Sequence, residues 1–180
     1  MVNAHGTALG GRWNEISGDA PQQWLETARR LTRALPGVTR LDESGLLTAE
    51  AREQQQLKDE LGFAALYFNT GTAQFASGQA AALQKLLPRI QRLFALAAST
   101  GKQPQLEITG HTDAEGSAEF NQRLSETRAK HVLDALAAKG IDRAHLRASG
   151  AATKFPLRSE QSKEDKQLNR RVSFQITWQH

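Results

Sequence analysis

The chain has 180 residues, of which 39% are hydrophobic and 23% are charged, a composition typical of a globular protein rather than a disordered one. It contains no cysteine, which excludes disulfides, thiolate metal sites and a lipid-bearing cysteine within it. The formal net charge is +4, but the 23 basic residues are mixed with 19 acidic ones and form no aromatic-interleaved stripe, so we expect no nucleic-acid partner.

The first 47 residues predict a small βαβ unit. Residues 9–16 contain glycine-interrupted apolar positions that indicate a strand, and alternation over residues 38–47 indicates a second strand. Between them, Pro21 opens a helix that ends at Pro36 and Gly37. The apolar residues expected on one face of this helix are Trp24, Ala28, Leu31 and Leu35.

Residues 48–61 are polar and rich in helix formers, and they predict a connecting helix ahead of a main domain over residues 62–180. In the main domain, periodicity predicts strands at 64–69, 105–109, 146–150 and 171–178 and helices at 77–98 and 117–139. Pro88 lies inside the first of these helices, where we expect a kink. The order βαβαββ predicts an α+β fold, a two-layer sandwich in which a mixed sheet carries its helices on one face.

The segment from Leu106 to Lys130, LEITGHTDAEGSAEFNQRLSETRAK, carries the most informative functional pattern. Its apolar alternation stops at Gly110, which permits a tight turn at the carboxyl end of a strand. The residues of this turn are His111, Thr112 and Asp113. A helix then begins near Ser117, and residues three and four apart on it share a stripe. The stripe consists of Asn121, Leu124, Ser125 and Arg128.

Asp113 and Arg128 are therefore expected to flank one pocket. Because a carboxylate accepts hydrogen bonds from an ammonium and a guanidinium pairs bidentately with a carboxylate, such a pocket suits a zwitterion. A lone arginine on a helix more often makes a solvated pair, here with Glu126 or Asp113. Arg170 and Arg171 point to opposite faces if their segment is extended, so at most one reaches the pocket, and we expect it to be Arg170.

Together these motifs resemble the OmpA-like peptidoglycan-binding domain, the family shared by the outer-membrane protein OmpA, the peptidoglycan-associated lipoprotein and the flagellar stator protein MotB. The resemblance covers roughly residues 66–178. Its parts are Leu66-Tyr67-Phe68-Asn69, Gly110-His111-Thr112-Asp113, Asn121 with Leu124-Ser125 and Arg128-Ala129, Gly140-Ile141 before Arg147, and Asn169-Arg170-Arg171-Val172. One departure stands after the third strand, where the family usually has Gly-x-Gly and this chain has Gly150-Ala151-Ala152.

The resemblance implies a non-catalytic module without a cofactor, which anchors an envelope protein to the cell wall by binding the diaminopimelate residue of the peptidoglycan stem peptide. It implies that Asp113 takes the amino group of this residue and that Arg128 takes the carboxylate. The other residues that it implies around the site are Thr112, Asn121, Leu124, Ser125, Asn169 and Arg170. The implied partners are peptidoglycan and other envelope proteins.

The sequence has no run of about 18 or more apolar residues, and its N-terminus lacks the charged and apolar regions of a signal peptide. We therefore expect no transmembrane segment, and a periplasmic piece of a membrane-anchored protein whose anchor lies outside this chain. Residues 1–47 also resemble the end of a BON-like repeat, through Trp24-x3-Ala28 and Leu35-Pro36-Gly37-Val38. An extension that packs on the main domain is an equal alternative for this segment.

Other classes of function have less support in the residues. His111 and Asp113 could form a metal pair, but the five histidines are scattered and show no ligand spacing, so we interpret His111 as a residue that shapes the turn. An enzyme is disfavoured because there is no Gly-x-Ser-x-Gly elbow and Ser125 has only His131, on another face, as a base. The open alternative is an OmpA-like fold that docks a protein partner without binding the wall.

Overall fold

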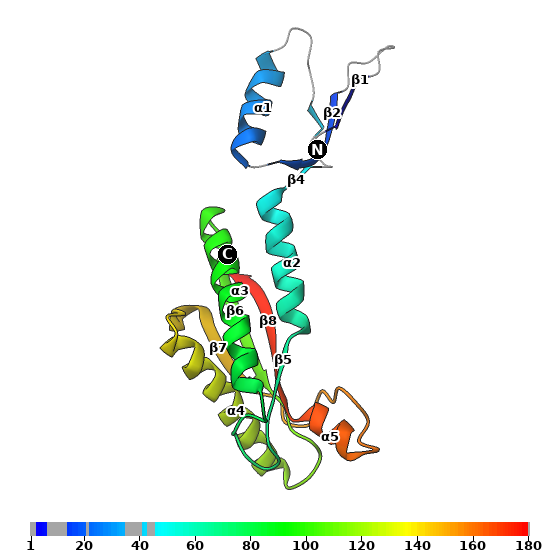
Figure 1. The fold of residues 1–180 in the computed structure, drawn as a ribbon, viewed down its shortest axis with the longest axis vertical. Helices are drawn as coiled ribbons and strands as arrows, with labels where there is room; N and C mark the ends of the chain where they lie inside the picture. Colours follow the sequence, from blue (N-terminus) through cyan, green and yellow to red (C-terminus); the bar gives the residue numbers. More distant parts are fainter. Residues whose placement is uncertain (1–2, 7–13, 21, 35–40, 43–45, 180) are drawn as a thin grey trace. The chain divides into compact units, whose positions relative to one another are not determined.

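The structure, a computed structural model, describes residues 3–6, 14–20, 22–34, 41–42 and 46–179. It divides into one unit of residues 1–56 and a second of residues 57–180, each described by itself below (Figure 1). Within the described residues, no helix combines the length and the apolar character that crossing a bilayer requires.

The described residues of the first unit form a small sheet, helix α1 and the start of a second helix. Strand β1 (Asn3–Gly6) pairs antiparallel with β2 (Asn14–Ala20), which pairs parallel with β3 (Leu41–Asp42) and β4 (Leu46–Thr48). Helix α1 (Gln22–Ala34) connects β2 to these parallel partners, so the βαβ prediction is confirmed. The remainder of the two predicted strands, including Val38, lies outside the described residues.

The buried face of α1 differs from the prediction. Leu25 is buried, whereas Trp24 and Leu31 are 43% and 61% exposed. Ala28 is half-buried, so the stripe that turns inward begins one residue later than the apolar residues suggested. A unit of this size has too little core to cover every apolar side chain of its helix.

The second unit begins within helix α2 (Ala49–Phe63) and alternates strands with helices after it. Its elements are β5 (Ala65–Tyr67), α3 (Gln79–Ser99), β6 (Gln103–Gly110), α4 (Ala118–Ala138), the single 3-10 turn η1 (Arg143–His145), β7 (Leu146–Gly150), α5 (Lys163–Asn169) and β8 (Arg171–Gln179). These bounds confirm the predicted strands and the two long helices to within a few residues. Helix α5 is an element that the sequence did not predict.

The sheet of this unit has the order β5-β8-β6-β7. Strand β8 pairs antiparallel with both β5 and β6, whereas β6 and β7 run parallel. Helices α3 and α4 pack on one face of this sheet (Figure 1). The predicted α+β fold with a mixed sheet is therefore confirmed, and Pro88 lies inside α3, which runs as one helix from Gln79 to Ser99.

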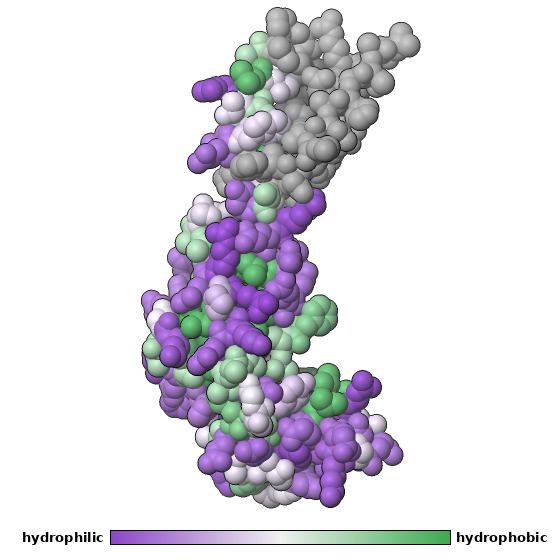
Figure 2. Space-filling view, viewed as in Figure 1, coloured by the Kyte–Doolittle hydropathy of each residue, from purple (hydrophilic) through white to green (hydrophobic). Residues whose placement is uncertain are grey.

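The face of residues 57–180 that Figure 2 shows is mostly hydrophilic, with hydrophobic spots between the hydrophilic side chains. The large apolar side chains exposed in this unit are Phe63, Phe120, Phe155 and Leu157. Two of the four, Phe155 and Leu157, lie in the segment that joins β7 to α5.

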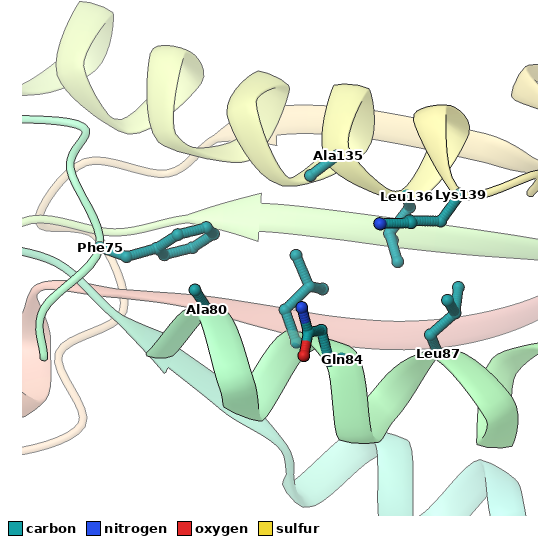
Figure 3. A pocket seen from close by; sticks show the side chains of 8 residues that line it. Phe75, Ala80, Gln84, Leu87, Ala135, Leu136 and Lys139 are labelled. Carbon is teal, nitrogen blue, oxygen red and sulfur yellow. The ribbon is translucent and has the colours of Figure 1, made fainter. Parts of the chain in front are cut away.

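A concavity of about 200 Å³ lies between α3 and α4 (Figure 3). It is lined by Phe75, Ala80, Leu83, Gln84, Leu87, Ala135, Leu136 and Lys139. Lys139 is its one charged residue, so this concavity lacks the acidic group that a zwitterion requires.

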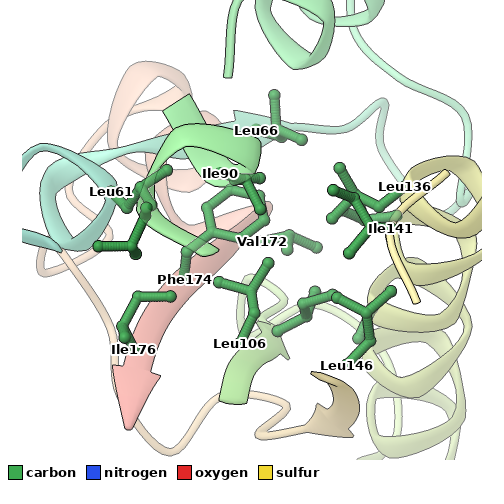
Figure 4. Packing of buried hydrophobic residues seen from close by; sticks show 14 of the residues in the cluster. Leu61, Leu66, Ile90, Leu106, Leu136, Ile141, Leu146, Val172, Phe174 and Ile176 are labelled. Atoms are coloured by element: carbon green, nitrogen blue, oxygen red, sulfur yellow. The ribbon is translucent and has the colours of Figure 1, made fainter. Parts of the chain in front are cut away.

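The hydrophobic core fills the space between the helices and the sheet (Figure 4). It combines Ile90 and Leu93 of α3 with Val132 and Leu136 of α4 and with residues from the strands. The strand residues and the remaining members are Leu61, Leu66, Phe68, Leu106, Ile108, Ala129, Ile141, Leu146, Val172, Phe174 and Ile176. This rigid layer holds the strand ends that carry the candidate site.

Candidate binding site

The candidate site lies where three strands meet. Strand β6 ends at Gly110, its parallel neighbour β7 ends at Gly150, and β8 begins at Arg171. The turn after β6 is tied to both neighbours, because His111 N donates to Arg171 O at 2.8 Å and Thr112 N donates to Ala152 O at 3.0 Å. These bonds fix the direction in which the turn presents Asp113.

Asp113 forms a buried ion pair with Arg170. Arg170 Nη1 donates to Asp113 Oδ2 at 2.7 Å, and the two side chains are only 10% and 8% exposed. Arg170 Nη2 also donates to Gln167 Oε1 of α5 at 2.6 Å. Charge-assisted bonds of this length are strong, so the end of α5 holds a guanidinium directly against the carboxylate of the turn.

Arg128 lies beneath the same turn and is fully buried. Its three nitrogens each donate to a backbone carbonyl at 2.9 Å: Nε to Thr72, Nη1 to His111 and Nη2 to Asn69. The guanidinium also lies 5.3 Å from the ring centre of Phe68. Burial lowers the pKa of Arg128 to about 10, and the nearby charge of Asp113 opposes this shift. At neutral pH Arg128 is thus a buried cation with two N–H groups beyond these three bonds.

The polar stripe of α4 is the face that packs inward. Asn121 Nδ2 donates to Glu115 O at 2.9 Å, while Leu124 is half-buried. Ser125 Oγ donates to Gln122 O at 2.8 Å and accepts from Ala152 N at 3.1 Å. The stripe therefore braces the loops around the turn.

Two glycines allow α4 to approach this closely. A Cβ built on Gly110 would overlap the backbone carbonyl of Ser125, and one built on Gly150 would overlap its Oγ. Ser117 caps the N-terminus of α4, because its Oγ accepts from Phe120 N at 3.2 Å. Ser125 lies about two helical turns after this cap.

Asn169 uses all of its hydrogen-bonding capacity on one loop. Its Oδ1 accepts from Leu157 N at 2.8 Å and from Arg158 N at 3.1 Å. Its Nδ2 donates to Arg158 O at 2.9 Å and to Glu160 Oε1 at 3.0 Å. The carboxylate of Glu160 in turn accepts from Ala114 N, so the loop after β7 is fastened to the turn that carries Asp113.

Several buried polar atoms around the turn have no hydrogen-bond partner within the described part of the chain. They are His111 Nδ1, Thr112 Oγ1, Arg170 Nε and Arg171 Nη1. Buried polar groups are normally satisfied; here Thr112 Oγ1, Arg170 Nε and Arg171 Nη1 can donate, and His111 Nδ1 donates or accepts according to its tautomer. Such a gathering of buried polar atoms beside an ion pair is what a site for a polar, charged ligand requires.

Comparison with known proteins identifies the family of this chain. The sequence model of the OmpA family matches residues 67–170, which include the turn, α4 and α5. The chain belongs to the OmpA family. OmpA-family domains are non-catalytic, which confirms the expectation that the matched region is not an enzyme.

Individual relatives of this OmpA-family chain agree with the match. YfiB of Escherichia coli K12 is 40% identical over 98 residues, which are 52% of this chain and 61% of YfiB. The peptidoglycan-associated lipoprotein of Burkholderia pseudomallei superposes with a TM-score of 0.53 at 24% identity, covering 63% of this chain and 89% of that one. The C-terminal domain of Helicobacter pylori MotB gives 0.56 at 20% identity, covering 64% and 85%. The last two show the same fold.

The matched regions cover only part of this chain and only part of each relative. This chain spans 61% of YfiB and 33% of YiaD, another relative from Escherichia coli K12 that is 35% identical over 72 residues. The OmpA family match begins at residue 67, and the resemblance of residues 1–47 to a BON-like repeat has no support among these comparisons.

The departure from the family pattern after β7 has a visible consequence. Ala152 stands where the second glycine of Gly-x-Gly is expected, and it adopts a φ of +46°, in the left-handed region. Its backbone nevertheless makes the two bonds to Thr112 and Ser125 that hold the OmpA-family turn. The loop keeps its tight path, so an alanine carries strain that a glycine would avoid.

His111 is a structural residue in this arrangement. Its Nε2 lies 3.0 Å from Ser173 Oγ, and burial, followed by the charge of Arg171, lowers its pKa to about 4. Among the residues that the structure describes, no three His, Cys, Asp or Glu side chains gather as metal ligands.

The structure thus places the residues predicted for the site in two groups. The first group is at the turn: Thr112 and Asp113 belong to it, and Arg128 and Arg170 lie against it. Arg170, rather than Arg128, pairs with the carboxylate of Asp113. The others, Asn121, Leu124, Ser125 and Asn169, lie around this group, and all but Leu124 have their polar atoms bonded to loops. Sequence reasoning missed Gln167 and Glu160, whose only local signal is the Ser-x-x-Asp capping pattern that starts α5 at Ser162.

Proposed function

We propose that residues 62–180 bind peptidoglycan non-covalently through the diaminopimelate residue of its stem peptide, and that this anchors an envelope protein or complex to the cell wall. The observation that carries the proposal is the buried Asp113–Arg170 pair, with Arg128 beneath it and buried donors without protein partners beside it. Membership of the OmpA family gives the same expectation.

The chemistry of the site fits a zwitterion. The free end of diaminopimelate carries an ammonium and a carboxylate on one carbon. The ammonium pairs with Asp113, and the carboxylate forms ion pairs with the guanidinium groups of Arg128 and Arg170. Thr112 Oγ1 and Arg170 Nε are buried donors within the same turn and strand ends, and they complete the hydrogen bonds of the carboxylate.

The place of action follows from the same argument. The solved relatives include a peptidoglycan-associated lipoprotein and a MotB domain, and other solved MotB structures cover its periplasmic domain. We propose that this chain acts in the periplasm as part of a membrane-anchored protein. Residues 1–47 and the helix over 48–61 then act as a unit and a connector ahead of the wall-binding domain.

Calorimetric titration tests the proposal directly. The chain is titrated with a stem peptide that contains diaminopimelate and, in parallel, with an analogue in which lysine replaces it and removes the second carboxylate. Saturable binding to the first alone is expected, because only the first offers both charges to Asp113 and the arginines.

A matched pair of variants separates binding from folding. Asp113→Asn removes the charge that holds the ammonium and is expected to weaken binding at least tenfold. Asp134→Asn removes a carboxylate of α4 whose pairs with Lys130 and Arg143 lie on the surface, and it leaves binding unchanged. Circular dichroism of both variants reports whether the fold is kept. Full binding by a folded Asp113→Asn variant, or equal binding of both peptides, contradicts the proposal and favours an OmpA-like fold that docks a protein partner.

A further inference from the structure

The loop between β7 and α5 presents two large apolar side chains to solvent. Phe155 and Leu157 are 65% and 52% exposed, and Pro156 stands between them. Lys154 and Arg158, both exposed, flank the pair. We name residues 154–158 the ledge. A surface of this kind combines apolar contact area with positive charge at its two ends.

The ledge is held in place by buried residues of the candidate site. Arg171 Nη2 donates to Phe155 O at 3.1 Å. Asn169 accepts from the backbone N–H groups of Leu157 and Arg158 and donates to the carbonyl of Arg158. Arg171 and Asn169 are each more than nine-tenths buried. The exposure of the two apolar side chains is therefore fixed by the fold, and it is continuous with the network that holds the Asp113 turn.

The connection between the ledge and the turn is short. Arg171 O accepts from His111 N at 2.8 Å, so one residue bonds both the ledge and the first residue of the turn. Glu160, two residues beyond the ledge, accepts from Ala114 N just after Asp113. Two hydrogen-bonded links, one through Arg171 and one through Glu160, therefore join the ledge to the turn that carries Asp113.

We propose that the ledge is a second subsite for the stem peptide, which receives the D-alanyl end that follows diaminopimelate. This inference rests on the proposed function. The D-alanine methyl groups complement Phe155 and Leu157, and the terminal carboxylate complements Lys154 and Arg158, which supply opposite charge at the rim. The zwitterion site then recognises the diaminopimelate side chain, while the ledge reads how much of the peptide follows it.

The test compares two synthetic ligands on the full chain by calorimetry. One is the stem tripeptide that ends at diaminopimelate, and the other is the tetrapeptide with one D-alanine added. The unaltered chain is expected to bind the tetrapeptide about fivefold more tightly than the tripeptide. The double variant Phe155→Ala/Leu157→Ala is expected to bind both ligands equally, with the affinity that the unaltered chain shows for the tripeptide.

Two further variants sharpen the result. Phe63→Ala removes a phenylalanine at the end of α2 that is 91% exposed, more than Phe155, and it is expected to keep the fivefold preference. Arg158→Gln is expected to reduce the preference for the tetrapeptide but not for its C-terminal amide, because only the free acid offers a charge to this residue.

The outcomes distinguish the ledge from the zwitterion site. If the unaltered chain binds neither peptide, the proposed function fails and the ledge proposal fails with it. If the chain binds both peptides equally, or if the double variant keeps the preference, the ledge alone is overturned. Competition by a peptide-free glycan fragment that disappears in the double variant would overturn the assignment to peptide and give the ledge to the sugar chain.

Discussion

The three bonds of Arg128 predict that this residue determines stability as well as the shape of the site. Replacing it by methionine keeps a long, buried side chain but leaves the carbonyl groups of Asn69, Thr72 and His111 without their donors. Each buried carbonyl group left without a donor costs about 1–3 kcal/mol of folding free energy. Part of this cost is offset because folding no longer has to desolvate the charge of Arg128. We expect Arg128→Met to lower the free energy of unfolding by about 3–5 kcal/mol.

A loss of that size is a large fraction of the stability of a small domain, which is typically about 5–15 kcal/mol. Arg128→Lys keeps the charge but not the planar fork, so it is expected to lose about half as much. Arg123→Met, on the exposed face of the same helix, is the control and is expected to change stability by less than about 0.5 kcal/mol.

Urea denaturation measures these differences. Of the three tryptophans, only Trp178 lies in residues 57–180, so its fluorescence in a Trp13→Phe/Trp24→Phe background reports that unit alone. A loss below about 1 kcal/mol for Arg128→Met would refute the claim that the three carbonyl bonds support the site. A normal stability combined with lost peptide binding would instead show that Arg128 acts on the ligand alone.

The buried histidine and the strained alanine give two more predictions. Unfolded His111 binds a proton below pH 6.5 but folded His111 only below about pH 4, so stability is expected to fall by up to about 3 kcal/mol as pH drops through this window. Urea titrations at several pH values should show this fall reduced in His111→Gln, and an equal fall in both proteins would contradict the assignment. Ala152→Gly is expected to raise stability by about 1 kcal/mol because it relieves the positive φ, whereas Ala151→Gly, without that strain, is expected to lower it. Thermal melts of both variants measure the difference, and a loss of stability in Ala152→Gly would show that the left-handed conformation carries no cost.

Local pattern was sufficient for most of the fold. The strand over residues 146–150 and the helix that starts after Ser117 have strict periodicity and clear end signals, and both match the structure closely. Helix α5 was missed because its seven residues are nearly all polar and offer no apolar period. Its capping pattern at Ser162 and Asp165 is a real signal, but such short patterns also occur in loops.

The sequence was enough to predict which residues form the site, but not which of their side chains contact each other. The order and spacing of the motifs along the chain are enough to predict that Asp113, Arg128 and Arg170 share one site. Which arginine meets the carboxylate depends on how β8 and the loop at Asn69 are placed, and these lie more than fifty residues away from their partners. Local periodicity contains no information about contacts at that separation, so the burial of Arg128 and the full use of Asn169 emerge only from the folded chain.

The position of β8 has a consequence for how this domain forms. Strand β8 is the last strand in sequence, yet it lies between β5 and β6 and is the only strand that pairs with β5 among those described. Until β8 is in place, β5 has no partner and the sheet consists only of β6 beside β7. The sheet therefore closes through contacts between distant parts of the chain, which makes folding slow and leaves the nascent domain open until its C-terminal strand has emerged. A chain shortened before Arg171 would lose the central strand and, with it, the residue that joins the ledge to the turn.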